Sequence, residues 1–153
     1  MIKPLDKKDY RAVYDLSKRL EPYPEYNYYD QLSDVLDTRR GFTVWNGNGK
    51  LVAFLSYSDF MPGVQVTIHF LNEPGGLNRA VVRKAFGFPF NDLQVPVLVS
   101  YSIKGLTDKA GDFLKRLGFR PEGVRKEAAR LPDGPRDVEM FGMLARECRW
   151  TNG

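Results

Sequence analysis

The chain has 153 residues, of which 42% are hydrophobic and 27% charged, so we expect one globular domain over residues 1–153 rather than a disordered protein. Its net charge of +4 permits an anionic ligand. The sequence lacks the dense basic stripe that is typical of a general nucleic-acid binder. Cys148 is the only cysteine, which excludes an internal disulfide and a cysteine-based metal cluster, and we expect no metal site.

The N-terminal part is predicted to form a short strand and two helices. Residues 2–5 are the strand candidate, and Asp6 is the expected N-cap of an amphipathic helix over 7–20. Prolines then stop this helix, and a second helix is predicted over 27–38. The first residues lack the apolar run of a signal peptide, and no stretch reaches the length of a membrane span, so we expect a cytoplasmic protein.

The middle of the chain reads as three strands followed by a helix. Strands over 42–45 and 50–58 flank a hairpin turn signal, Asn46-Gly47-Asn48-Gly49. Residues 64–71 form an alternating, β-rich third strand. A helix follows with an inward face that includes Leu93, and Pro89 is expected to kink it or to shorten it by a turn.

The C-terminal part adds three strands and one helix. Residues 95–101 are mostly apolar, which predicts a strand buried on both faces. A helix over 107–117 ends at Gly118, and two strands over about 119–129 and 136–145 complete the chain. This order of elements predicts a mixed α/β sheet with helices on both faces.

The stretch from Glu73 to Leu93 carries the clearest functional signal. It follows a strand, begins with two glycines, and has no acidic residue between Glu73 and Asp92. The start of a helix collects unpaired N–H groups and the positive end of the helix dipole, and both favour anions. We therefore predict that a pyrophosphate binds where this helix begins.

Two further stretches resemble the GNAT acyltransferases. Phe113-Leu114-Lys115-Arg116-Leu117-Gly118-Phe119-Arg120-Pro121-Glu122-Gly123 resembles the family's junction between its last long helix and its sixth strand. The region 137–150 is similar to a GNAT subgroup common in tailed phages. The resemblance in the order of elements extends over nearly the whole chain, whereas the resemblance in individual residues is confined to about 73–150. The resemblance implies a GNAT-like, mixed, mostly antiparallel central sheet of about seven strands with helices on both faces.

The resemblance also implies a reaction, the transfer of an acetyl group from acetyl-CoA (coenzyme A) to an amine, which is a small molecule or a protein. The pantetheine arm is then expected in an opening between strands 64–71 and 95–101. The glycine-led helix stands where GNAT proteins hold the pyrophosphate. The residues expected at the cofactor are Leu71, Gly75, Gly76, Leu77, Asn78, Arg79 and Arg83. For the two arginines, a solvated helix face is the alternative.

Four positions depart from the family pattern. Pro74 and Asn78 replace small residues of the glycine motif, Leu114 replaces a tyrosine that protonates the leaving thiolate, and Thr107 replaces a common asparagine. These departures leave two alternatives open. One is a catalytically inactive GNAT-like protein that acts as a phage virion, assembly or host-interaction component, and the other is a module that binds CoA without turnover. A homodimer is among the oligomeric states left open.

Three residues are candidates for proton transfer. His69, the only histidine, is expected on the strand that borders the opening, where it could accept the amine proton. Glu73 is a second base candidate, and Tyr101 is the candidate that protonates the thiolate. The alternatives are a half-buried histidine satisfied by a hydrogen bond, a glutamate that balances positive charge, and a packing tyrosine. A further cluster is expected either to line the acceptor site or to pack the first helix pair: Tyr23, Tyr26, Tyr28 and Tyr29.

Overall fold

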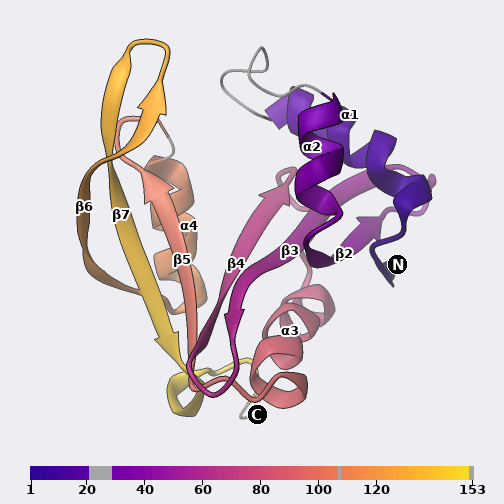
Figure 1. Ribbon diagram of the computed structural model, residues 1–153. Coiled ribbons are helices and arrows are strands. Elements are labelled where there is room, and N and C mark those ends of the chain that lie inside the picture. The colour runs from indigo at the N-terminus through magenta and orange to yellow at the C-terminus, as the bar shows by residue number, and fades with distance from the viewer. Residues whose placement is uncertain (21–28, 107, 152–153) are drawn as a thin grey trace. The chain divides into compact units, whose positions relative to one another are not determined.

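The computed structural model of the chain describes residues 1–20, 29–106 and 108–151 (Figure 1). Its strands are β1 (Ile2–Pro4), β2 (Arg40–Trp45), β3 (Leu51–Met61), β4 (Gln65–Asn72), β5 (Val97–Ile103), β6 (Arg120–Leu131) and β7 (Gly134–Leu144). Its α-helices are α1 (Tyr10–Leu20), α2 (Tyr29–Leu36), α3 (Arg79–Gly87) and α4 (Asp108–Leu117). Three shorter helical turns are η1 (Lys7–Asp9), η3 (Phe88–Asp92) and η4 (Ala145–Glu147). The predicted order of elements is thus confirmed over the described residues.

The strands form one seven-stranded sheet in the order β1-β2-β3-β4-β5-β7-β6. β4 and β5 are parallel, through the pairs Gln65↔Val97, Val66↔Leu98 and Thr67↔Val99. β1 with β2, β2 with β3, β5 with β7 and β6 with β7 are antiparallel. The predicted mixed, mostly antiparallel sheet is therefore confirmed. The chain divides into two compact units, of which the first comprises Met1–Asp59 and Ile68–Ala85 and the second Phe60–Thr67 and Phe86–Gly153.

In the first unit, α1 and α2 pack on one face of β3. Their shared core consists of Tyr10, Val13, Leu16, Leu36, Leu51 and Phe54. Asp6 is the N-cap of η1, which leads into α1, and its side chain accepts a hydrogen bond from the Lys8 amide at 3.0 Å. The Tyr10 hydroxyl donates to the Asp37 carboxylate at 2.9 Å. Burial, together with this carboxylate, raises the pKa of Tyr10 to about 12.

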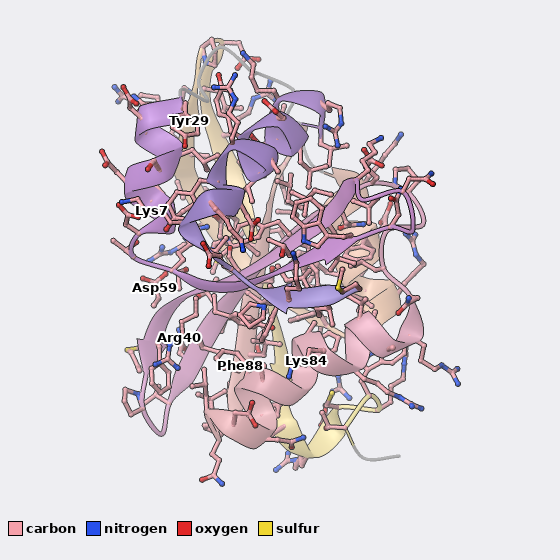
Figure 2. All side chains as sticks on the ribbon, turned by 90° about the vertical axis from the view of Figure 1, so that its right-hand side faces the viewer. Lys7, Tyr29, Arg40, Asp59, Lys84 and Phe88 are labelled. Carbon is pink, nitrogen blue, oxygen red and sulfur yellow. The ribbon has the colours of Figure 1, made fainter. Side chains whose placement is uncertain are left out.

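The opposite face of β3 meets α3. Tyr57 lies an odd number of positions from Phe54 on β3, so the two side chains point to opposite faces of the sheet. The Tyr57 hydroxyl donates to the Ala85 carbonyl oxygen at 2.7 Å. The ammonium group of Lys84, labelled in Figure 2, lies 5.4 Å from the centre of the Phe42 ring. The first unit therefore carries helices on both faces of its strands, as predicted.

Pro89 explains how α3 ends. The α-helix stops at Gly87, and the chain continues as the π-helical turn η3, in which the Leu93 amide donates to the Phe88 carbonyl oxygen at 2.9 Å. Pro89 has no N–H to donate to Ala85, four residues earlier, and the Tyr57 hydroxyl supplies the donor instead. The predicted shortening is confirmed, whereas the π-helical turn was not predicted. Leu93, expected in the core, is only partly buried.

In the second unit, β7 pairs with both β5 and β6, and α4 packs on β5 and β7. A Cβ atom on Gly111 of α4 would lie 3.2 Å from the Ser102 Oγ and 3.4 Å from the Phe141 ring, so glycine permits the close approach of the helix. The Trp150 ring lies parallel to the Phe86 ring at 6.4 Å between centres. The Trp150 indole N–H donates to the Leu117 carbonyl oxygen at 2.9 Å, which fixes the C-terminal segment to the end of α4.

The prediction that the strand over 95–101 is buried on both faces is wrong. In β5, buried Leu98, Ser100 and Ser102 alternate with more exposed positions, and Tyr101 retains 41% of its exposure. α4 covers one face of β5, and the alternation follows because successive side chains of a strand point to opposite faces. Two serines on the covered face show that an apolar run in the sequence did not mark the buried positions.

Candidate functional site

The residues that follow β4 form a tight turn. The Gly76 N–H donates to the Glu73 carbonyl oxygen at 2.8 Å, and Gly75 has φ +76. Proline in the second position and a glycine of positive φ in the third are typical of a type II β-turn. The second position of such a turn needs no N–H donor, so the turn explains why Pro74 replaces the small residue of the family motif.

Gly76 packs directly against β3. A Cβ atom at this position would lie 2.7 Å from the Val52 carbonyl oxygen and 3.0 Å from that of Glu73. The Val52 carbonyl also accepts the Glu73 N–H at 2.9 Å. Glycine is therefore required here by the approach of the turn to β3, and the Gly76 N–H is already bonded within the chain. Gly75 differs, because a Cβ atom there would meet no atom within 4 Å.

Asn78 caps α3. Its side-chain oxygen accepts a hydrogen bond from the Val81 N–H at 2.9 Å, and its carbonyl oxygen accepts one from Val82 at 3.0 Å. This second departure from the family motif is thus an N-cap residue of a favoured type. In the part of the chain that the structure describes, four consecutive amides lack an acceptor: those of Leu77, Asn78, Arg79 and Ala80. Open donors at the positive end of a helix dipole can bind an anion.

The other predicted cofactor residues lie around this helix start. Arg79 and Arg83 are exposed and one helical turn apart. Leu71 is partly buried and packs against the apolar core of the first unit. The structure thus brings the turn, the helix start and the arginines together, while the Leu71 side chain is engaged by the core.

The Glu73 carboxylate pairs with two cations. Its Oε1 lies 2.9 Å from the Arg19 guanidinium and 3.3 Å from the Lys50 ammonium. The hydrogen bond from Arg19, followed by that from Lys50, lowers the pKa of Glu73. A carboxylate with a lowered pKa is a weaker proton acceptor, so this geometry matches the interpretation that Glu73 balances positive charge.

His69 lies on β4 with its Nε2 atom 2.7 Å from the Ser58 Oγ. Burial, together with the Arg39 charge, lowers the pKa of His69 to about 4, and the Asp59 charge opposes this change. Asp59, labelled in Figure 2, adopts a left-handed backbone with φ 55 and lies 3.2 Å from the Ser58 hydroxyl. The imidazole is therefore neutral at pH 7 and hydrogen-bonded, which is one of the two interpretations that the sequence left open.

The remaining candidates are spread over the chain. Tyr101 belongs to the second unit and sits opposite Met140 in the β5–β7 ladder. Leu114 retains 2% of its exposure, so it belongs to the core. Tyr29 packs edge-on against Tyr14, with 5.6 Å between ring centres. Four residues singled out in the sequence lie outside the described residues: Thr107, Tyr23, Tyr26 and Tyr28.

Sequence reasoning missed Arg19 and Lys50. Arg19 is 54 positions from Glu73, so no local spacing could have revealed their ion pair. Among the described residues, no three histidine, cysteine or acidic side chains lie close enough to hold a metal ion. Over the same residues, none of the helices has the length and apolar character needed to cross a bilayer.

The comparisons with known proteins concern the fold. No protein-family model and no curated protein sequence matches the chain. A mutant of the spermidine N-acetyltransferase SpeG from Vibrio cholerae superimposes with a TM-score of 0.78 at 17% identity, over 99% of this chain and 98% of that one. A chimera of Vibrio cholerae SpeG and hSSAT gives 0.76 at 18%, over 95% and 97%. A dodecameric structure of the Vibrio cholerae enzyme gives 0.74 at 17%, over 95% and 93%. The chain therefore has the fold of the GNAT acyltransferases.

Proposed function

We propose that the chain transfers an acetyl group from acetyl-CoA to an amine. The observation that carries the proposal is the start of α3, where four consecutive amides, from Leu77 to Ala80, have no acceptor among the described residues. This helix start follows β4 in a chain that shares its fold, over 99% of its length, with a spermidine N-acetyltransferase. The proposed ligand at these amides is the CoA diphosphate.

The residues at the helix start fit this group. A diphosphate requires several hydrogen-bond donors and positive charge, and the open amides and the exposed Arg79 and Arg83 provide both. Gly75 faces open space, so the turn leaves room for a ligand beside it. Asn78 holds the first turn of the helix in place through its cap. We therefore assign binding of the diphosphate to the backbone and charge attraction to the arginines.

The chemical step requires a proton acceptor for the amine nitrogen and a proton donor for the leaving thiolate. Acetyl-CoA, when bound, supplies the thioester whose carbonyl carbon the amine attacks. We propose His69 as the proton acceptor, because its imidazole is neutral at pH 7 whereas the Glu73 carboxylate is engaged by two cations, although burial lowers the pKa of His69 just as the ion pairs lower that of Glu73. Tyr101, whose side chain is 41% exposed, is the proposed proton donor to the thiolate.

The proposed acceptor class is an aliphatic polyamine, because the structural neighbours are named spermidine N-acetyltransferases. One of these neighbours is described as a dodecamer. We propose that this chain also associates with copies of itself, with a homodimer as the smallest assembly. Light scattering with and without acetyl-CoA measures this directly.

The test begins with cofactor binding. Thermal unfolding is followed with acetyl-CoA, free CoA and ATP, because a ligand of the folded state raises the melting temperature. Arg79→Ala is expected to weaken binding and to reduce its dependence on ionic strength, whereas Arg125→Ala, on β6 in the second unit, is the matched control. Release of free thiol is then measured with spermidine and simpler amines. Absence of any stabilisation at millimolar acetyl-CoA would refute the proposal.

A second candidate function is binding of CoA without turnover. The position of the family's thiolate-protonating tyrosine is occupied here by Leu114, which is buried. Stabilisation by acetyl-CoA without release of thiol across the amine panel would favour this candidate. A role as a phage virion, assembly or host-interaction component rests on the C-terminal resemblance and on the departures from the family motif, and absence of any CoA binding would favour it.

A further inference from the structure

We propose that Glu73 is a positioning residue, which holds the turn at the start of α3 through Arg19 and Lys50 and is not the proton acceptor of the reaction. This inference rests on the proposed function, because the turn sets the direction of the amides that would bind the diphosphate. We call the three side chains Arg19, Lys50 and Glu73 the Glu73 cluster.

The backbone of Glu73 already fixes one side of the turn. Its N–H donates to the Val52 carbonyl oxygen at 2.9 Å, and its carbonyl oxygen accepts the Gly76 N–H at 2.8 Å. Gly76 lies against the same Val52 carbonyl oxygen. The four open amides begin at Leu77, directly after this turn. A change in the position of Glu73 therefore changes the position of the amides.

The side chain of Glu73 ties the same turn to two other elements. Arg19 lies in the last turn of α1, and Lys50 immediately precedes β3. Arg19 also reaches the Leu51 carbonyl oxygen at 3.4 Å. The Glu73 side chain retains 22% of its exposure, compared with 42% for Arg19 and 54% for Lys50. The carboxylate thus joins the turn, α1 and the start of β3 at one place.

The same contacts argue against proton transfer by Glu73. One oxygen atom of the carboxylate, Oε1, forms the ion pairs with both Arg19 and Lys50, so an amine that approached this atom would have to displace them. The ion pairs also lower the pKa of Glu73, which weakens it as a base.

The test compares steady-state kinetics of the full chain and its Glu73→Gln variant with acetyl-CoA and spermidine. We expect the KM for acetyl-CoA to rise about two- to tenfold, with kcat changed less than about twofold and an unchanged pH profile. Arg19→Gln should reproduce the rise, and the double variant should be no worse than the poorer single variant. Glu147→Gln, which breaks the exposed pair with Arg120 at 3.1 Å, is the matched control.

Three results would overturn the proposal. A fall in kcat of about 100-fold or more, with loss of one limb of the pH profile, would identify Glu73 as a general base. A KM that stays the same or falls would show that the cluster does not position the turn. Additive effects of the two variants would show that Arg19 and Glu73 act separately.

A measurement without cofactor separates this proposal from the proposed function. Amide hydrogen exchange of residues 73–80 is expected to be faster in Glu73→Gln than in the unmodified chain, and unchanged in Glu147→Gln. If the unmodified chain does not bind acetyl-CoA, the proposed function fails, and the exchange rates still decide whether the cluster holds the turn. Equal exchange rates in all three proteins would refute the positioning role.

Discussion

The pKa of His69 predicts how the stability of the chain depends on pH. Its value of about 4 in the folded protein compares with 6.5 for an ordinary histidine, and burial is the main cause. Between these two values the unfolded chain binds the proton and the folded chain does not, so stability must fall as the pH falls. The contribution of the neutral His69 side chain to the free energy of unfolding is complete above pH 6.5 and lost at pH 4. A lowering of this size corresponds to about 3 kcal/mol of unfolding free energy.

The perturbation that isolates this effect is His69→Gln, which keeps a polar atom for Ser58 but does not titrate. Urea unfolding of both proteins is measured from pH 7.5 to pH 4, and subtraction removes the contribution of the carboxylates that both proteins share. The difference should be flat above pH 7 and should decline by about 3 kcal/mol toward pH 4. Because His69 is the only histidine, its NMR titration is assigned without further experiments. A measured pKa near 6.5, or a difference that does not vary with pH, would refute the reasoning.

Three further substitutions test the packing that shapes the site, each by urea unfolding. Gly76→Ala should lower the free energy of unfolding by about 1–3 kcal/mol, because its Cβ would lie 2.7 Å from the Val52 carbonyl oxygen. Gly75→Ala should lower it by only about 1 kcal/mol, because the positive φ of Gly75 is the only obstacle there. Equal losses would contradict the assigned contact. Tyr57→Phe removes the donor to the Ala85 carbonyl and should cost about 1–3 kcal/mol, and a neutral result would mean that another donor replaces it. Leu114→Tyr should destabilise by about 1–3 kcal/mol without raising turnover, and a gain in thiol release would show that the position reaches the substrate.

The elements most accessible to sequence reasoning were those with local signals. The Asn46-Gly47-Asn48-Gly49 turn predicted the β2–β3 hairpin, and the Asn46 amide does donate to the Lys50 carbonyl oxygen at 2.9 Å. Helical spacing predicted α1 and α4, and the order of elements predicted the mixed sheet. In the hairpin and the two helices, the residues that determine the structure lie within a few positions of one another. Local chemistry is therefore enough to predict it.

The features that were missed depend on distant parts of the chain. The ion pair between Arg19 and Glu73 joins residues 54 positions apart, and only the folded chain brings them together. The alternating burial of β5 depends on which of its faces α4 covers, and an apolar run cannot show this. Gly76 was expected at the cofactor, whereas the atom that a Cβ at this position would meet first belongs to β3. In all three cases the tertiary partner determines the role of the residue.

The departures from the family motif have unequal consequences for binding and for turnover. Pro74 and Asn78 serve the turn and the helix cap, and the four amides that follow Gly76 lack an acceptor within the described part of the chain, so neither departure argues against a diphosphate. Leu114 is different, because its burial leaves no polar group at the family's proton donor position. The loss of a proton donor lowers the rate of the chemical step, whereas it leaves backbone contacts to the cofactor intact. Binding of acetyl-CoA and turnover of an amine must therefore be measured separately, and only the second depends on a replacement such as Tyr101.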